Sequence, residues 1–390
     1  MSFYRNGTER VNFRLANYTT EIASSIKEVD WDEWDQTVAD AGGSVFHTSR
    51  WLRAFEEASS AEVIPYHVIV RLNGEVVGLS PAYVTGYCPR LELYRNNLLA
   101  DYGRFEQKML ISHTLYGQYS QVLVRRAPYK DVYDLIIKAI HDGCKQREVP
   151  FYGFPMVHGQ DPLLEFLREK GFVVRYMNSV NKLWLTEGDL DCYLARFPSR
   201  KKRNLQMILR KATDLGLVVI RQLGETEMKD LIELSLRTCS HHGSPKFFSE
   251  EFLDKTLQYL GDDVVAVFVK TPDGKTIAGS MGLKYRDTLT PWVIGLDYSE
   301  LKRCDQYNLL YLAWINLAID NGLRLVEFGR GTFYIKAKFG VIREPIYICM
   351  QAVDPGDISR IGDWCETIEK NSMVHLAKFE DDYRILDHEH

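Results

Sequence analysis

The sequence lacks any cysteine pattern that would hold a metal ion or build a disulfide framework. It has seven cysteines, an odd number, and no two of them form a C-x-x-C pair. Zinc sites and disulfide-rich folds both depend on regularly spaced cysteines. We therefore expect reduced thiols, no metal site and a cytoplasmic protein. The cysteines are Cys88, Cys144, Cys192, Cys239, Cys304, Cys349 and Cys365.

Long apolar runs are also missing. No run approaches the roughly 20 residues that a helix needs to span a bilayer, and residues 1–7 contain no apolar signal region. The longest apolar block, 309–319, is typical of a core helix. We expect neither a membrane span nor export.

The chain has no excess of positive charge. Its 53 acidic residues outnumber its 48 lysines and arginines, which gives a formal net charge of −5. This balance argues against a protein that binds nucleic acid over its whole surface, but it allows a local basic patch. One run without an acidic residue has that character, and its basic residues are Arg196, Arg200, Lys201, Lys202, Arg203, Arg210 and Lys211. The run is either a docking surface for phosphates or the solvated face of a helix.

Two hairpin patterns organise the 390 residues into two halves. In the first half, β-rich runs at 66–72 and 75–79 flank Asn73-Gly74, which favours a type I′ turn because both residues tolerate positive φ. In the second half, 264–270 and 276–285 flank Pro272-Asp273-Gly274. Each hairpin is followed by a long helix pattern and a further strand pattern. This shared order predicts two copies of one unit.

The predicted domains are an N-terminal extension (1–26), a first domain (27–188), a second domain (189–354) and a C-terminal helix with a tail (355–390). The other helices are expected at 31–38, 49–58, 131–145, 162–170 and 309–319, and the other strands at 122–124, 149–154, 172–176, 182–185, 292–296 and 323–328. Asn321-Gly322 is a C-cap signal for the 309–319 helix. The mixture gives an α/β (α+β) fold.

In the order of these elements the chain resembles the GNAT acyltransferase superfamily. The second half is similar to its Fem-type, FemAB-like branch, whose members often carry two GNAT units in tandem. The residues that carry the resemblance are Ser199–Asn204, Gly243–Phe252 and Lys336–Gly340 in the second half, and Phe46–Trp51 and Asp101–Gly103 in the first. The resemblance implies two tandem GNAT-like domains, each a mixed, mostly antiparallel sheet flanked by helices.

The resemblance also implies a reaction. Such an enzyme forms an amide by moving an acyl or aminoacyl group from an activated carrier to an amine on a small molecule or cell-wall precursor. It needs no tightly bound cofactor, since the donor is a co-substrate: aminoacyl-tRNA, an acyl carrier protein or acyl-CoA. The other possibility is a non-catalytic GNAT-like protein that binds a cell-wall, sugar or peptide precursor.

One departure from the family bears on the donor. GNAT enzymes that bind acetyl-CoA place a glycine-rich loop after the splayed strand, where main-chain N–H groups hold the pyrophosphate. Here the corresponding loop, 297–308, contains no glycine. We expect the donor to be bound differently, by Lys302 and Arg303 or by the basic residues Arg200, Lys201, Lys202 and Arg203. The basic run then offers a docking site for tRNA or a carrier protein.

Amide formation requires a proton acceptor for the amine, donors for the oxyanion and a proton for the leaving group. The main chain of 292–296 is the expected oxyanion site. Gly295 either lets a ligand approach this strand or packs under a helix. The candidate catalytic residues are Lys336, which matches the Fem-type lysine, Tyr334 as a proton donor, and His241 and His242 as proton acceptors. The candidate acceptor-binding residues are Asp101, Tyr102 and Phe247.

Overall fold

The computed structural model describes residues 9–11, 17–59, 63–85, 108–114, 116–242, 248–331 and 333–377. Contacts divide the chain into two compact units. The first unit comprises Met1–Asn178, Glu251–Tyr259 and Pro345–His375, and the second comprises Ser179–Glu250, Leu260–Glu344 and Leu376–His390. The two units are interleaved along the chain, whereas the sequence predicted consecutive domains. Asp101, Tyr102, Phe247 and Cys88 lie outside the described residues.

One sheet of the first unit contains the predicted N-terminal hairpin. Its strand order is β1-β2-β4-β5-β8, with β1 Glu9–Val11, β2 Tyr18–Ala23, β4 His67–Leu72, β5 Glu75–Ser80 and β8 Leu123–Val124. Asn73 and Gly74 have φ values of 53° and 92°, as a type I′ turn requires. The segment predicted as an extension thus supplies β2, which pairs with β4.

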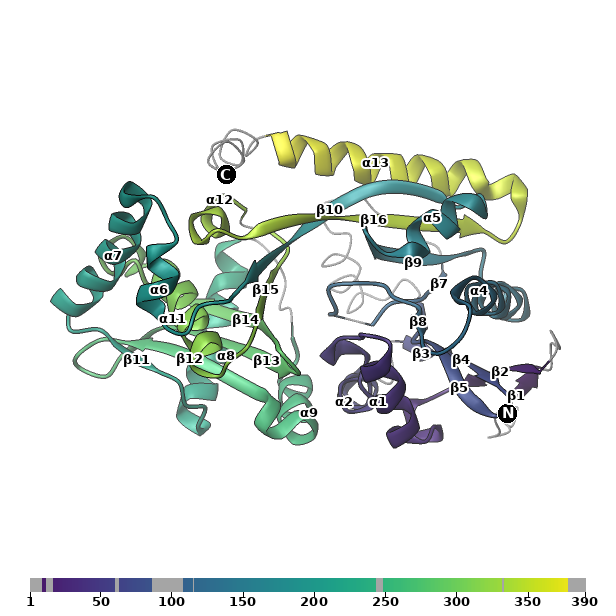
Figure 1. Cartoon of the computed structure of the whole chain (residues 1–390), viewed down its shortest axis with the longest axis horizontal. Helices are drawn as coiled ribbons and strands as arrows, with labels where there is room; N and C mark the ends of the chain where they lie inside the picture. The colour runs from purple at the N-terminus through teal and green to yellow at the C-terminus, as the bar shows by residue number, and fades with distance from the viewer. Residues whose placement is uncertain are drawn as a thin grey trace. The chain divides into compact units, whose positions relative to one another are not determined.

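The second group of strands in the first unit is bordered by helices. These strands are β3 Val63–Pro65, β6 Tyr83–Thr85, β7 Met109–Ile111 and β9 Phe151–His158. The α-helices among the described residues of the unit are α1 Trp31–Asp40, α2 Ser49–Ser59, α4 Tyr129–Gln146, α5 Pro162–Glu169, α9 Glu250–Leu260 and α13 Ile358–Ala377. Figure 1 shows α13 running along β10 and β16. The helix is anchored there because Ser372 donates to the carbonyl of Met177.

Helix α9 belongs to the first unit although its sequence lies in the second half. The ring of Phe252 packs against Trp51 and Phe55 of α2, with centroids 5.4 and 5.8 Å apart. The Tyr259 hydroxyl donates to the carboxylate of Glu57 at 2.7 Å. This long-range packing explains why the sequence pattern alone did not assign α9 to the first unit.

Two long strands pass from one unit to the other. They are β10 Val173–Trp184 and β16 Ile342–Ala352, and the boundaries between the units fall at Asn178/Ser179 and Glu344/Pro345. The sequence predicted two short strands, 172–176 and 182–185, where the structure has the single strand β10. It did not predict β16.

The strands of the second unit are ordered β11-β12-β13-β14-β15-β10. They are β11 Val218–Ile220, β12 Val264–Lys270, β13 Thr276–Tyr285, β14 Thr288–Leu296 and β15 Leu325–Gly329. Its helices are α6 Leu190–Ala195, α7 Ser199–Asp214, α8 Glu225–His241, α10 Leu301–Cys304, α11 Gln306–Asp320 and α12 Phe333–Lys336. The predicted second hairpin coincides with β12 and β13.

Helices α8 and α11 cover opposite faces of this sheet. A side chain at Gly279 would point toward Leu231 of α8, whereas one at Gly282 would meet Trp314 of α11. Almost all of α11 is apolar and buried, so it forms the centre of the core. It ends as predicted: Gly322 has a φ of 64°, and the N–H of Leu323 donates to the carbonyl of Ala318.

Candidate functional site

The candidate site begins where β14 and β15 separate. These strands are parallel and pair only at their first residues, Thr288 with Leu325 and Leu289 with Val326. Beyond this point β14 pairs only with β13 among the described strands, and the register shifts by one residue at Trp292. A bulge of this kind redirects the strand and is common beside active sites.

A cavity of about 510 Å³ lies at this separation, entirely within the second unit. Its lining comes from α8, β13, β14, α11, the end of β15 and α12. The lining residues are Thr238, His241, His242, Ser280, Pro291, Trp292, Val293, Ile294, Leu296, Tyr298, Tyr307, Leu310, Tyr311, Trp314, Phe328, Arg330, Gly331, Tyr334, Ile335 and Lys336. Aromatic rings predominate, and none of these described lining residues is acidic. The cavity therefore combines an apolar wall with positive charge.

Lys336 is buried in the cavity wall, with only 3% of its surface exposed. Its ammonium Nζ donates to the carbonyls of Phe328, Gly329 and Arg330, at 2.8, 3.2 and 2.6 Å. Burial, with a smaller effect of the Arg330 charge, lowers the pKa of Lys336 to about 7. The three carbonyl oxygens act to raise the pKa of Lys336, because only the protonated amine has three N–H donors for them. Lys336 thus holds the end of β15 in place.

The segment that carries Lys336 is helical. Phe333–Lys336 form α12, and Ala337–Phe339 continue as a 3-10 helix that ends at Gly340 with a φ of 71°. Lys336 is buried and Lys338 is exposed because of this helical turn. Tyr334 is 43% exposed and also lines the cavity.

The two histidines meet a tyrosine that the sequence analysis did not single out. The ring of His241, the last residue of α8, stacks on Tyr298 with centroids 3.7 Å apart. The Nε2 atom of His242 lies 3.0 Å from the Tyr298 hydroxyl. Partial burial of the ring, followed by the nearby charge of His241, lowers the pKa of His242. The lowered pKa favours the neutral form of His242 at pH 7.

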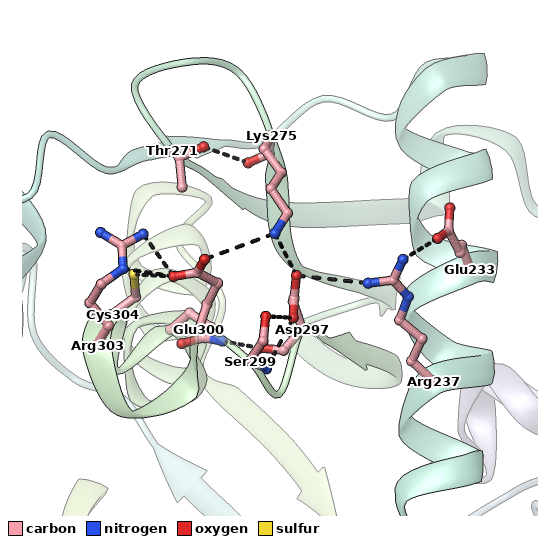
Figure 2. Close-up of polar contacts among 10 residues, drawn as sticks. Glu233, Arg237, Thr271, Lys275, Asp297, Ser299, Glu300, Arg303 and Cys304 are labelled. Carbon is pink, nitrogen blue, oxygen red and sulfur yellow. Dashed lines mark hydrogen bonds and ion pairs between the residues drawn. The ribbon is translucent and has the colours of Figure 1, made fainter.

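The loop after β14 is closed by ion pairs, both within the loop and to side chains outside it. Figure 2 shows the Asp297 carboxylate between Lys275 and Arg237, with N···O distances of 2.8 and 3.8 Å. Arg303 binds Glu300 at 2.7 Å, and Lys275 also approaches Glu300. Burial acts to raise the pKa of Asp297, but hydrogen bonds from Lys275 and Ser299 outweigh it and leave that pKa lowered.

Four main-chain N–H groups of this loop, those of Ser299, Glu300, Arg303 and Cys304, are engaged within it. The N–H of Ser299 donates to the Asp297 carboxylate at 3.0 Å, and that of Glu300 donates to the Asp297 carbonyl at 3.1 Å. The N–H groups of Arg303 and Cys304 both donate to the Glu300 carbonyl. A pyrophosphate would need these donors and would face two carboxylates. The residues present therefore do not fit a conventional CoA pyrophosphate site.

Two predicted donor-binding residues, Gly295 and Arg303, do not line the cavity. A Cβ atom at Gly295 would come within 2.6 Å of the Leu234 Cβ and the Ser235 main-chain nitrogen. Close packing against α8 thus accounts for Gly295, which does not line the cavity. Arg303 is paired with Glu300 and also lies outside the lining, while Lys302 lies on α10.

Helix α7 contains all the basic residues of the run except Arg196. The Lys201 ammonium reaches the carbonyl of Ala337 at 3.2 Å and lies over the ring of Phe197. Arg200, Arg203 and Arg210 are exposed, and Lys202 is half-buried. Arg200, Arg203 and Arg210 fall within one side of the helix, because 3.6 residues make a turn.

The described residues contain no group of three or more His, Cys, Asp or Glu side chains that could hold a metal ion. In the same part of the chain, no helix is both long and apolar enough to cross a membrane. No disulfide joins the six described cysteines.

Comparison with known proteins agrees with this geometry. Residues 199–337 match the family model described as an acetyltransferase (GNAT) domain. The second unit contains a GNAT acyltransferase domain. This GNAT domain begins at α7 and ends just after Lys336, so it includes every residue that lines the cavity. Among the curated proteins, none matches this chain at a significant level.

Solved structures extend the likeness to most of the chain. FemX has a TM-score of 0.59 at 11% identity and aligns over 82% of this chain and 96% of its own. A tandem GNAT protein from the clavulanic acid biosynthesis pathway has a TM-score of 0.53 at 13% identity, covering 87% and 99%. L-PGS from Bacillus licheniformis has a TM-score of 0.51 at 11% identity, covering 86% and 97%. The predicted tandem GNAT fold is therefore confirmed.

The site thus contains some predicted residues and some that were missed. Tyr334, Lys336, His241 and His242 come together in one cavity. Tyr298 was missed because a tyrosine in a polar loop carries no spacing signal. Its position directly after the strand 292–296 was the one available indication.

Proposed function

We propose that the GNAT domain transfers an acyl or aminoacyl group from an activated carrier to an amine, within the cavity between β14 and β15. The main support is the separation of these strands beside a bulge at Trp292, which leaves strand main chain next to an apolar cavity. Main-chain N–H groups in such a place stabilise the oxyanion that forms as the amine attacks. The apolar lining keeps water from competing with the amine.

We further propose that the donor is an aminoacyl-tRNA rather than acyl-CoA. The support is the closed loop 297–304, in which carboxylates and internal hydrogen bonds occupy the groups that a pyrophosphate would use. A donor without a pyrophosphate does not need that loop. RNA phosphates instead need exposed cations, which Arg200, Arg203 and Arg210 of α7 offer.

The acceptor in this proposal is a neutral amine on a small molecule or precursor. With no carboxylate among the described lining residues, the cavity favours the uncharged amine, which is also the nucleophilic form. Asp101, Tyr102 and Phe247 remain candidate acceptor-binding residues.

The test supplies three donor classes separately: aminoacyl-tRNA, an acyl group on a carrier protein and acyl-CoA. Amide products are detected by mass spectrometry with a mixture of amine acceptors. We expect product with aminoacyl-tRNA. Product only with a carrier protein or with CoA would contradict the donor assignment. Ligand binding without product from any donor would favour the non-catalytic alternative.

Reversing charges on α7 tests the docking surface. The variant Arg203→Glu/Arg210→Glu should raise the Kd for tRNA about tenfold at 0.1 M salt and reduce the salt slope by about two, one for each lost phosphate contact. The matched control is Lys229→Glu/Arg324→Glu, which changes the charge equally at two exposed residues of the same unit. Equal loss of affinity in both variants would mean that net charge, and not α7, binds the RNA.

A further inference from the structure

Tyr298 and His242 form a hydrogen-bonded pair at the border of the cavity. Both line it, and the Tyr298 hydroxyl lies 3.0 Å from His242 Nε2. Tyr298 is half-buried, whereas His242 is exposed to solvent. The pair thus connects the interior of the cavity with bulk water.

The polar network in Figure 2 fixes Asp297 and Ser299, the residues on either side of Tyr298. Asp297 is fixed by Lys275, and Ser299 by hydrogen bonds from its N–H and hydroxyl to the Asp297 carboxylate. The Tyr298 ring itself stacks on His241 from α8. Such support from charged groups and a stacked ring is typical of a preorganised side chain.

We propose that Tyr298 and His242 relay the proton that the acceptor amine loses, a role that rests on the proposed acyl transfer. As the amine nitrogen bonds to the acyl carbon, its N–H proton passes to the Tyr298 oxygen. The tyrosine O–H proton passes at the same time to His242 Nε2. The tyrosine ends unchanged, and the resulting imidazolium releases its proton to solvent. The electron pair of the broken acyl–oxygen bond stays on the carrier's oxygen, which takes a proton from solvent and leaves as the carrier's hydroxyl group.

The surroundings favour a neutral His242 before the reaction. His241 is next to it on α8, and Arg330 and Lys336 bring positive charge to the same cavity. The Asp297 carboxylate is the nearby opposite charge, and it is paired with Lys275 and Arg237. Tyr307 and Cys239 also lie close to Tyr298. A neutral imidazole is the form that can accept a proton.

The relay is tested with Tyr298→Phe, His242→Gln and the double variant, assayed at saturating donor and acceptor. Each single variant should lower kcat about 10²-fold with little change in KM, as is usual for loss of one general base. The double variant should be no slower than either single variant, because the two residues act in one path.

The pH dependence gives a further test. Wild-type kcat should fall as the pH drops through the pKa of His242, which lies below 6.5, and this fall should be absent in His242→Gln. Tyr129→Phe, at an exposed tyrosine of α4 in the first unit, is the control.

A second readout does not depend on activity. In nitrogen-15 NMR spectra, wild-type His242 should be the neutral tautomer with the proton on Nδ1 and a hydrogen-bonded Nε2, and Tyr298→Phe should abolish that signature. Unchanged kcat in Tyr298→Phe, or an Nε2 that carries the proton, would overturn the relay. If the wild-type chain transfers no acyl group while the NMR signature is present, the proposed function is wrong. The hydrogen-bonded pair would then exist without a role in acyl transfer.

Discussion

Replacing Lys336 with methionine should destabilise the second unit by about 3 kcal/mol. Methionine has a similar length but no N–H donor, so the carbonyls of Phe328 and Arg330 lose their Lys336 hydrogen bonds. An unsatisfied buried carbonyl costs about 1–3 kcal/mol. The Gly329 carbonyl is less affected, because Asn181 also donates to it at 2.8 Å. Urea unfolding monitored by circular dichroism measures the loss.

The control for this substitution is Lys338→Met, at an exposed lysine two residues later. Exposed substitutions of this kind change stability by no more than about 0.5 kcal/mol. We also expect Lys336→Met to reduce transfer, since Phe328, Arg330 and Gly331 form the cavity wall. Full stability combined with lost transfer would show that Lys336 acts on the substrate rather than on β15, as the resemblance to the Fem-type lysine implied.

Introducing a single methyl group at Gly295 should lower the free energy of unfolding about as much as Lys336→Met does. In Gly295→Ala the new Cβ would lie 2.6 Å from the main-chain nitrogen of Ser235, and the helix backbone cannot yield as a flexible side chain does. Forced overpacking costs about 1–3 kcal/mol. Since α8 carries His241 and His242 at its end, its displacement should also lower kcat. Thermal unfolding and single-turnover transfer measure the two effects.

The matched control is Gly188→Ala in the same unit, where a Cβ meets no atom within 4 Å. Its stability should stay within about 0.5 kcal/mol of wild type. A Gly295→Ala variant that unfolds normally but binds donor poorly would restore the alternative role of Gly295, close approach of a ligand to the strand.

Local signals in the sequence were sufficient for much of the fold. The turn Asn73-Gly74 and the C-cap Gly322 depend on the φ angles of single residues, so they could be predicted from residue type alone. The pairing of α9 with α2 and the continuity of β10 depend on contacts between distant segments. No periodicity within one segment carries that information.

The site was predictable to the extent that its chemistry lies in unusual residue types. His241, His242 and Lys336 were recognised in this way, and the missing glycines of 297–308 drew attention to the loop after β14. Lys336 was expected to face a ligand, but its donors bind carbonyls of its own chain. The tertiary packing of α12 against the end of β15 determines which groups the Lys336 ammonium contacts, and the sequence pattern does not contain this information.

The most direct test of the account is the timing of RNase treatment in a transfer assay. The chain is incubated with a labelled amino acid, its synthetase, tRNA and the acceptor mixture, and RNase is added either before or after the transfer step. The account predicts that RNase added before transfer abolishes the labelled amide and that RNase added afterwards leaves it intact. Labelled amide that forms after prior RNase treatment, or that forms from acyl-CoA alone, would contradict it.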